Sequence, residues 1–156
     1  MKKLALSFAL IASLATVAAA DNRKAVAPQN ATLAEIQNTF GFVPDFIKGV
    51  PDALLPGFWA GITGLEMNPV TKLDGKTKEL IGLAVAAQVP CEYCIYFHTE
   101  AARLNGATDE EIKEAVAMAS LTRMGSTILN GNQTDKAQFK KDVQRIVDGA
   151  KAHAKK

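Results

Sequence analysis

Apolar residues along this chain recur with the period of an α-helix rather than with that of a β-strand. One helical face consists of Leu80, Leu83, Ala84 and Ala87, and another of Phe139, Val143, Ile146 and Ala150. Residues spaced three and four apart share one side of a helix. No stretch alternates apolar and polar residues between turn signals, as a half-buried strand would. The pattern therefore predicts one all-α domain.

Capping and breaking residues divide this pattern into helices. Thr32 with Glu35 forms a capping box, which predicts a helix start, and Gly41 predicts the end of that helix. Thr108 with Glu111 forms a second capping box at the start of a longer helix. The remaining helices are predicted over residues 51–66, 74–88, 91–104 and 135–150. A flexible lead-in is expected over 21–31 and a frayed tail over 151–156.

The first twenty residues predict a secretory signal peptide rather than a part of the fold. Lys2 and Lys3 precede an apolar run that ends in three alanines, which is the charged, apolar, small-residue order of such signals. Cleavage after Ala20 leaves 136 of the 156 residues, enough for the single domain predicted over 32–150. We expect an exported, periplasmic protein, with an uncleaved anchor as the alternative.

Removal of the signal peptide also changes the net charge. The whole chain has 18 Lys and Arg against 16 Asp and Glu, and without Lys2 and Lys3 the two counts are equal at 16. The mature chain therefore has no net positive charge to drive phosphate binding, so nucleic acid is not an expected partner. No other stretch is long and apolar enough to span a bilayer, so no membrane association is expected after cleavage.

Both cysteines and one of the two histidines lie within eight residues, at Cys91, Cys94 and His98. Pro90 fits the edge of a helix, so Cys91 is expected near a helix N-terminus. The three side chains then share one helical face, with neighbouring Cβ atoms about 5–6 Å apart. A helix N-terminus and a nearby imidazole both favour thiolate. The pattern indicates a redox-active dithiol.

Other kinds of site fit these residues less well. Attachment of c-type haem requires His directly after the second Cys, where this chain has Ile95. Zinc usually takes a second Cys/His pair, which the chain lacks, although both cysteines, His98 and a carboxylate stay open as ligands. A structural disulfide would close so short a loop that it contributes only on the order of 2 kcal/mol. No strand precedes Cys91, so the thioredoxin frame is not expected, and we expect neither cofactor nor metal.

Glu79 is an unusual residue, since it stands in an apolar helix twelve residues before Cys91. It reaches the cysteine face if the two helices pack antiparallel across the Val89-Pro90 break. The pattern alone favours a solvated carboxylate beside Lys76 and Lys78. Candidates for a substrate pocket are Trp59, Tyr93, Tyr96 and Phe97, although such aromatic residues are more often core or subunit interface.

Glu79, Cys91, Cys94, His98 and the cap at residues 105–112 together resemble the alkyl hydroperoxidase D-like branch of the carboxymuconolactone decarboxylase family, over roughly residues 40–130. The resemblance implies a compact helical domain with its site on two adjacent helices, assembled as a homo-oligomer (trimer or hexamer). It also implies that Glu79 and His98 form a proton relay to the dithiol. Cys94 would attack peroxide, and Cys91 would resolve the sulfenic acid.

The activity implied by this resemblance is that of a thiol-dependent peroxidase for hydrogen peroxide or small organic hydroperoxides. The decarboxylase branch lacks the dithiol, which argues against lactone decarboxylation. Tyr93 stands where mycobacterial members carry His, and an exported protein would not meet their cytosolic lipoyl-protein reductant. The thiol reductant is therefore undefined. The alternatives are a general dithiol–disulfide oxidoreductase and a non-enzymatic helical binding protein.

Overall fold

The computed structural model describes residues 22–154, and describes their side chains from residue 29 onward. The expected signal peptide, residues 1–20, lies outside the described residues. Contacts divide the chain into two compact units, one ending at Gly61 and the other beginning at Ile62. Every element in the described residues is helical, which confirms the all-α prediction.

The first unit consists of α1 (Asn22–Phe40), the 3-10 turn η1 (Asp45–Gly49) and α2 (Leu55–Gly61). Its buried apolar side chains are Ile36, Ile47, Leu55 and Trp59. The indole ring of Trp59 packs edge-on against Phe40, with ring centroids 5.5 Å apart, and its Nε1–H donates to Glu35 at 3.2 Å. Trp59 is therefore a core residue of this unit.

The helix start expected at Thr32 is wrong, because α1 already begins at Asn22. The stretch expected as a flexible lead-in, 21–31, is helical wherever the structure describes it. Thr32 is buried in the middle of α1, and Glu35 accepts a hydrogen bond from Trp59 of α2. A helix that continues upstream has already satisfied the N–H groups that a capping box would serve.

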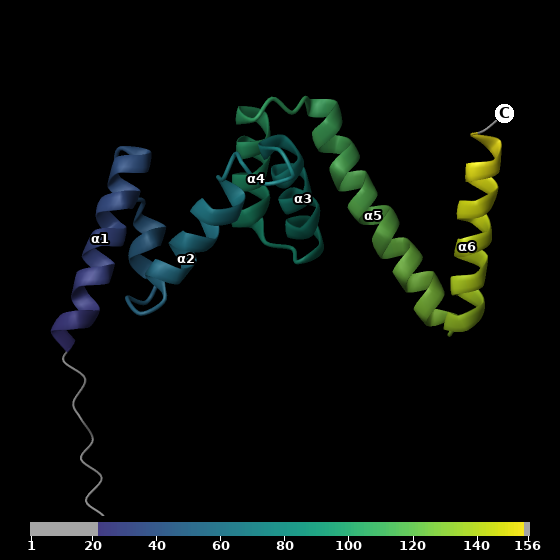
Figure 1. Cartoon of the computed structure of the whole chain (residues 1–156), viewed down its shortest axis with the longest axis horizontal. Coiled ribbons are helices and arrows are strands. Elements are labelled where there is room, and N and C mark those ends of the chain that lie inside the picture. The colour runs from purple at the N-terminus through teal and green to yellow at the C-terminus, as the bar shows by residue number, and fades with distance from the viewer. Residues whose placement is uncertain (1–21, 155–156) are drawn as a thin grey trace, which may run out of the picture. The chain divides into compact units, whose positions relative to one another are not determined.

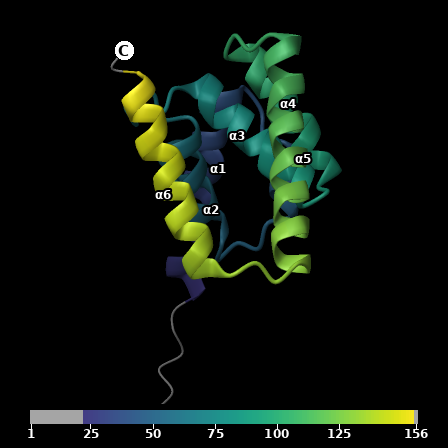
Figure 2. The ribbon, with the colours of Figure 1, turned by 90° about the vertical axis from the view of Figure 1, so that its right-hand side faces the viewer.

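The second unit begins with a π-helical turn, η2 (Ile62–Glu66), and continues through four α-helices. These helices are α3 (Gly75–Gln88), α4 (Glu92–Leu104), α5 (Asp109–Gly131) and α6 (Lys136–His153). Helix α3 packs against both α4 and α5, as Figures 1 and 2 show. The buried apolar residues of this packing are Leu83, Ala86, Ala102 and Ala119.

Local hydrogen bonds fix the ends of these helices where the sequence predicts them. The Asp74 carboxylate caps α3 by accepting from the Thr77 N–H at 2.7 Å. Gly106 ends the helix before the α5 cap with a φ of +85°, a conformation that glycine adopts without steric cost. At α5 both bonds of the capping box form, between Thr108 and Glu111, at 3.2 and 2.8 Å.

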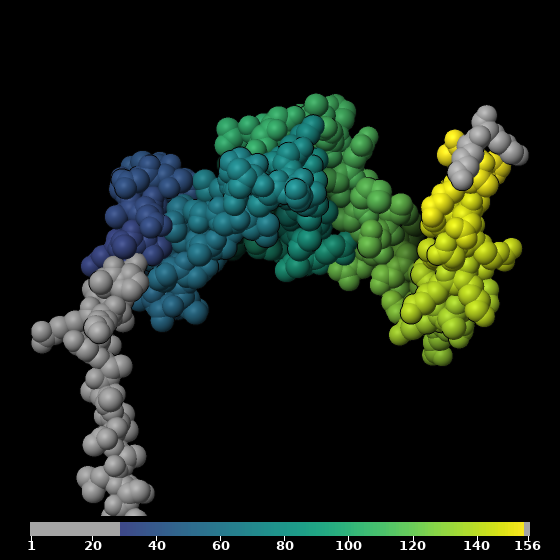
Figure 3. Space-filling model, viewed as in Figure 1, coloured from purple at the N-terminus to yellow at the C-terminus, as the bar shows by residue number. Residues whose placement is uncertain are grey.

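Helix α6 differs from α3, because none of its residues is buried. Figure 3 shows its atoms in yellow-green to yellow. The tail expected to fray over residues 151–156 is helical as far as His153. No helix in the described part of the chain combines the length and the apolar character needed to cross a membrane.

Candidate active site

The two cysteines form a disulfide at the start of α4. Cys91 is the N-cap residue of this helix, and its Sγ accepts the Cys94 N–H at 3.2 Å. Their Cα atoms lie 5.3 Å apart, within the usual range for a disulfide. The Cys91 N–H donates to the Ala86 carbonyl of α3 at 3.1 Å, which holds the short connection between the two helices. The expected position of Cys91 at a helix N-terminus is confirmed.

The surroundings of the disulfide suit a reactive dithiol. The N-terminal turn of α4 places partial positive charge beside both sulfurs, which favours thiolate in the reduced state. Cys94 is exposed and Cys91 is half-buried, so a small molecule from solvent reaches Cys94 more readily. Thiolate character and exposure are the two properties that make a cysteine reactive.

Glu79 and His98 form a hydrogen-bonded pair between α3 and α4. The distance between His98 Nδ1 and Glu79 Oε2 is 2.8 Å, and the side chains are 21% and 6% exposed. The solvated position that the pattern alone favoured for Glu79 is therefore wrong. The neighbouring lysines contact other groups: Lys76 pairs with Glu111 of α5 at 2.7 Å, and Lys78 donates to the Asn68 carbonyl at 2.7 Å.

A carboxylate only accepts hydrogen bonds, so an ionised Glu79 requires the proton of His98 on Nδ1. The other ring nitrogen, Nε2, then carries a lone pair that can accept a proton. His98 lies one turn after Cys94 on α4, on the same face of the helix. The arrangement therefore combines a dithiol with an oriented base on one helix, and the carboxylate that orients the base comes from its neighbour.

Gly82 makes this pairing sterically possible. It lies one turn after Glu79 on α3, on the same face. A Cβ atom built on Gly82 would lie 2.6 Å from Nδ1 and Cε1 of His98, and 2.8 Å from Nε2. Real Cβ atoms do not approach other atoms so closely. The imidazole therefore occupies the space that any larger residue at position 82 would fill.

The four aromatic residues suggested by the sequence lie in different surroundings. Trp59 lies in the core of the first unit, and Tyr93, Tyr96 and Phe97 are exposed on α4. Phe97 packs edge-on against the His98 ring, with centroids 5.3 Å apart. Phe97 therefore contacts the Glu79–His98 pair.

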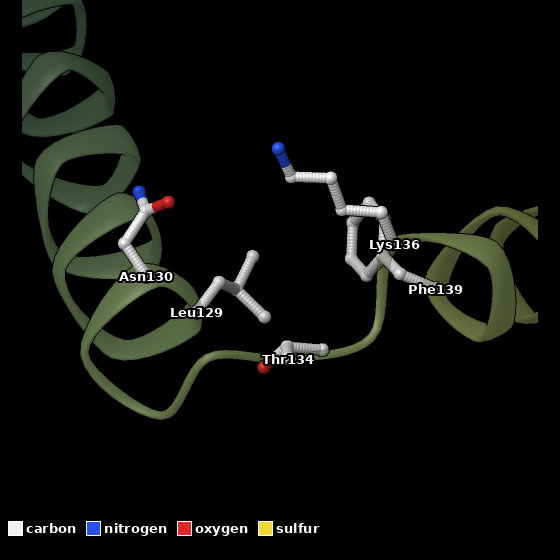
Figure 4. A pocket seen from close by; sticks show the side chains of 5 residues that line it. All are labelled: Leu129, Asn130, Thr134, Lys136 and Phe139. Atoms are coloured by element: carbon white, nitrogen blue, oxygen red, sulfur yellow. The ribbon is translucent and has the colours of Figure 1, made fainter.

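Neither of two shallow hollows on the described residues is lined by the cysteines or by these aromatic side chains. Figure 4 shows the first, at the turn between α5 and α6, where Leu129, Asn130, Thr134, Lys136 and Phe139 line it. The second lies between α3 and α5 and is lined by Thr77, Leu80, Ile81, Ala84, Ala115 and Met118. Neither contains a pair of groups suited to acid–base or redox chemistry.

Glu66, the last residue of η2, lies at the Glu79–His98 pair. One potential ligand atom from each of the three side chains lies within 4.8 Å of the other two. Within this cluster, His98 Nδ1 and Glu79 Oε2 are hydrogen-bonded to each other. Cys91 and Cys94 are joined to each other, so the alternative zinc set, which needs thiolates, is not formed in this disulfide state.

The sequence pattern alone did not indicate Glu66 or Gly82 as site residues. Gly82 carries a usable signal, since an isolated glycine inside a helical pattern often marks a close approach, and it stands three residues after Glu79. Glu66 carries no such signal, because it ends one helical segment and meets Glu79 only through packing.

Comparison with known proteins identifies the family. A model of the carboxymuconolactone decarboxylase family matches residues 54–131, which is half of the chain and includes the whole dithiol region. The crystal structure of the alkylhydroperoxidase AhpD core from Rhodospirillum rubrum is similar, with a TM-score of 0.63 and 28% sequence identity. That similarity covers 76% of this chain and 90% of the solved one.

Two relatives are similar over shorter segments. Uncharacterized protein 4 in the cox locus of Paracoccus denitrificans is 43% identical over 61 residues, which is 39% of this chain. An uncharacterized protein of Cupriavidus necator is 41% identical over 46 residues, or 30% of this chain. The chain spans about half the length of these relatives, 55% and 41% respectively. The family match and the similar crystal structure together show that this chain belongs to the carboxymuconolactone decarboxylase family and has the alkyl hydroperoxidase D-like fold.

Proposed function

We propose that this protein is a thiol-dependent peroxidase that reduces hydrogen peroxide or small organic hydroperoxides. One observation carries the proposal: helix α4 combines the Cys91–Cys94 pair at its N-terminus with His98 one turn after Cys94, and His98 is held by Glu79. Similarity to the AhpD core supports the same class of reaction.

In the proposed reaction, Cys94 attacks first. Its thiol proton passes to Nε2 of His98, directly or through water, and the thiolate attacks the terminal oxygen of ROOH. The S–O bond forms as the O–O bond breaks, and His98 returns the proton to the leaving alkoxide, which departs as ROH. The Cys91 thiol then attacks the sulfenic acid sulfur, which gives the disulfide and one molecule of water. Two electrons from a thiol reductant restore the dithiol.

The order of the two cysteines follows from exposure and from the position of the base. Cys94 is the more exposed of the two, and it lies at i−4 from His98. Cys91 benefits more from the helix N-terminus, but a dipole only shifts an equilibrium, whereas a base transfers the proton. The N-cap position of Cys91 keeps its sulfur close to Cys94 for the second step.

The proposal is tested by stopped-flow loss of thiols from the pre-reduced protein mixed with cumene hydroperoxide. We expect two thiols to become one disulfide, much faster than a free thiol reacts. Cys94→Ser abolishes the fast reaction, while Cys91→Ser stops at a sulfenic acid that dimedone traps. His98→Ala and Glu79→Gln slow the reaction by about 10²–10⁴-fold, the usual contribution of acid–base catalysis, with the smaller loss for Glu79→Gln.

The other histidine provides a matched control. His153 lies exposed in the last turn of α6, so His153→Ala leaves the rate unchanged. Thiol loss no faster than that of a free thiol would contradict the peroxidase. Equal effects of His98→Ala and His153→Ala would contradict the relay.

A second candidate function is a general dithiol–disulfide oxidoreductase. The observation that favours it is the exposure of Cys94 beside Tyr93 and Tyr96, which are 90% and 72% exposed, so that a protein partner can approach. Such a protein exchanges its disulfide with protein or small-molecule thiols and consumes peroxide no faster than free thiol does. The stopped-flow comparison therefore separates the two functions.

We also propose that the protein is exported and that it self-associates. We place the protein in the periplasm, on the basis of its first twenty residues. A second copy of this chain is the proposed partner, because α6 leaves Phe139, Val143, Ile146 and Val147 exposed along one side. Light scattering on the purified protein is expected to give a trimer or hexamer, and a monomer would contradict this expectation.

A further inference from the structure

A third ionisable side chain, Glu66, lies beside the Glu79–His98 pair and has no role in the chemistry above. One oxygen of Glu66 lies within 4.8 Å of a Glu79 oxygen and of a His98 ring nitrogen. The Oε1 atom of Glu66 is inaccessible to solvent and has no hydrogen-bond partner among the described residues. An ionised oxygen in that position has lost water without gaining a donor, which is unfavourable.

The π-helical turn explains how Glu66 comes to this position. In η2 the Met67 N–H donates to the Ile62 carbonyl at 2.9 Å, one residue further back than in an α-helix. Such turns are frequent at functional sites. After the turn, Lys78 of α3 donates to the Asn68 carbonyl at 2.7 Å, which ties the segment that follows η2 to α3. Backbone geometry therefore holds Glu66 against α3 without a hydrogen bond to the buried oxygen of its carboxyl group.

The groups around Glu66 favour its protonated form. Burial raises the pKa of Glu66, the carboxylate of Glu79 on α3 raises it further, and His98 on α4 lowers it. The two lysines at this end of α3 do not compensate, because Lys76 pairs with Glu111 of α5 and Lys78 with a carbonyl. Two carboxyl groups that share one site with little solvent tend to keep a proton between them.

We propose that Glu66 is a positioning residue of the relay, which keeps its proton while Glu79 remains the one charged carboxylate beside His98. This inference rests on the peroxidase proposed above. With Glu66 neutral, His98 faces one negative charge, accepts the Cys94 proton and releases it to the alkoxide. With Glu66 ionised, a second negative charge holds the proton on His98, so the release of that proton to the alkoxide becomes slower. Ionisation of Glu66 thus switches the relay to a slower state as the pH rises.

The first test detects the proton on Glu66 directly. Infrared difference spectra compare the oxidised wild-type protein with Glu66→Gln from about pH 5 to about pH 9, in the presence of EDTA so that no cation replaces the proton. We expect a carboxylic-acid C=O band that is present in the wild type and absent in Glu66→Gln. The control Glu110→Gln, at an exposed position on α5, retains the band. If the Glu66→Gln substitution removes no carboxylic-acid band, the inference is overturned.

The second test measures the effect on the relay. The rate of thiol loss with cumene hydroperoxide is measured for the wild type and for Glu66→Gln from about pH 5 to about pH 9. The wild-type rate is then divided by the Glu66→Gln rate at each pH. Because the amide cannot ionise, the ratio is close to unity at the acidic end and falls by on the order of tenfold as Glu66 ionises. A flat ratio, or a Glu66→Gln rate already much lower at the acidic end, overturns the inference.

The two tests keep this inference apart from the proposed function. If the wild type itself consumes peroxide no faster than a free thiol, the peroxidase fails whatever Glu66 does, and the infrared band still decides whether Glu66 holds a proton. If the wild type is fast and the ratio is flat, the peroxidase stands and the role of Glu66 fails. Circular dichroism of Glu66→Gln confirms that both comparisons are made on folded protein.

Discussion

Substitution of Gly82 by Ala tests whether the contact between Glu79 and His98 matters, without removing either group. The new methyl group would lie 2.6 Å from Nδ1 and Cε1 of His98. Optimal non-bonded separations begin near 3.5 Å, so the ring or the helix must move by roughly 0.9 Å. The substitution is otherwise mild, since Ala in a helix interior is more favourable than Gly by about 1 kcal/mol.

The size of the effect follows from the hydrogen bond that this movement stretches. The distance between Nδ1 and Oε2 is 2.8 Å, and a movement of roughly 0.9 Å directly away from α3 would take it beyond the about 3.2 Å that a good N–H···O bond allows. A hydrogen bond to a charged group contributes about 1.5–3 kcal/mol. Each 1.36 kcal/mol corresponds to about tenfold in rate, so we expect Gly82→Ala to slow thiol oxidation by about 10- to 100-fold.

Two measurements check this expectation. Stopped-flow thiol loss gives the rate, and nitrogen NMR shifts of the imidazole report whether the proton still prefers Nδ1. The matched control is Gly125→Ala, inside α5, where a Cβ atom would meet nothing within 4 Å. A Gly82→Ala protein with the wild-type rate and the wild-type tautomer would refute the reasoning, because the contact would then tolerate a methyl group.

The remaining predictions concern stability. Leu83 is 1% exposed, so Leu83→Ala lowers the free energy of unfolding by about 2–5 kcal/mol in urea titrations, whereas Leu104→Ala, at an 88% exposed position, changes it by less than about 0.5 kcal/mol. Thr108→Ala removes one bond of the α5 capping box and costs about 1 kcal/mol, while Thr108→Ser retains most of it. Reduction of the disulfide costs at most on the order of 2 kcal/mol, so circular dichroism shows a folded reduced protein, and unfolding on reduction would instead indicate a structural staple. Because the pKa of Glu66 is raised in the folded state, its contribution to stability is full below the pKa of the unfolded chain and is lost as the pH rises through the raised value. The melting temperature of the wild type relative to Glu66→Gln therefore falls with rising pH, and a difference that stays constant would contradict the raised pKa.

The two capping boxes show how far local sequence determines structure. Thr32 with Glu35 and Thr108 with Glu111 have the same spacing, yet only the second opens a helix. Gly106, with its positive φ, ends the preceding helix before Thr108, so the N–H groups of the next helix need a cap. Upstream of Thr32 the chain is already helical, and α1 runs through it. A capping motif is therefore decisive only where the chain upstream cannot stay helical.

The sequence by itself determined the helical class, most helix ends in the second unit, and the position of the dithiol one turn before a histidine. These features depend on hydrogen bonds and side-chain spacing within a few residues, which the order of residues specifies directly. Only the tertiary structure decided that Glu79 is buried against His98, nineteen residues away, and that Glu66 joins them. It also decided that Gly82 provides the space for the imidazole. Burial and charge at such a site are set by which helix faces pack together, and the pattern of a single helix cannot tell a buried carboxylate from a solvated one beside two lysines.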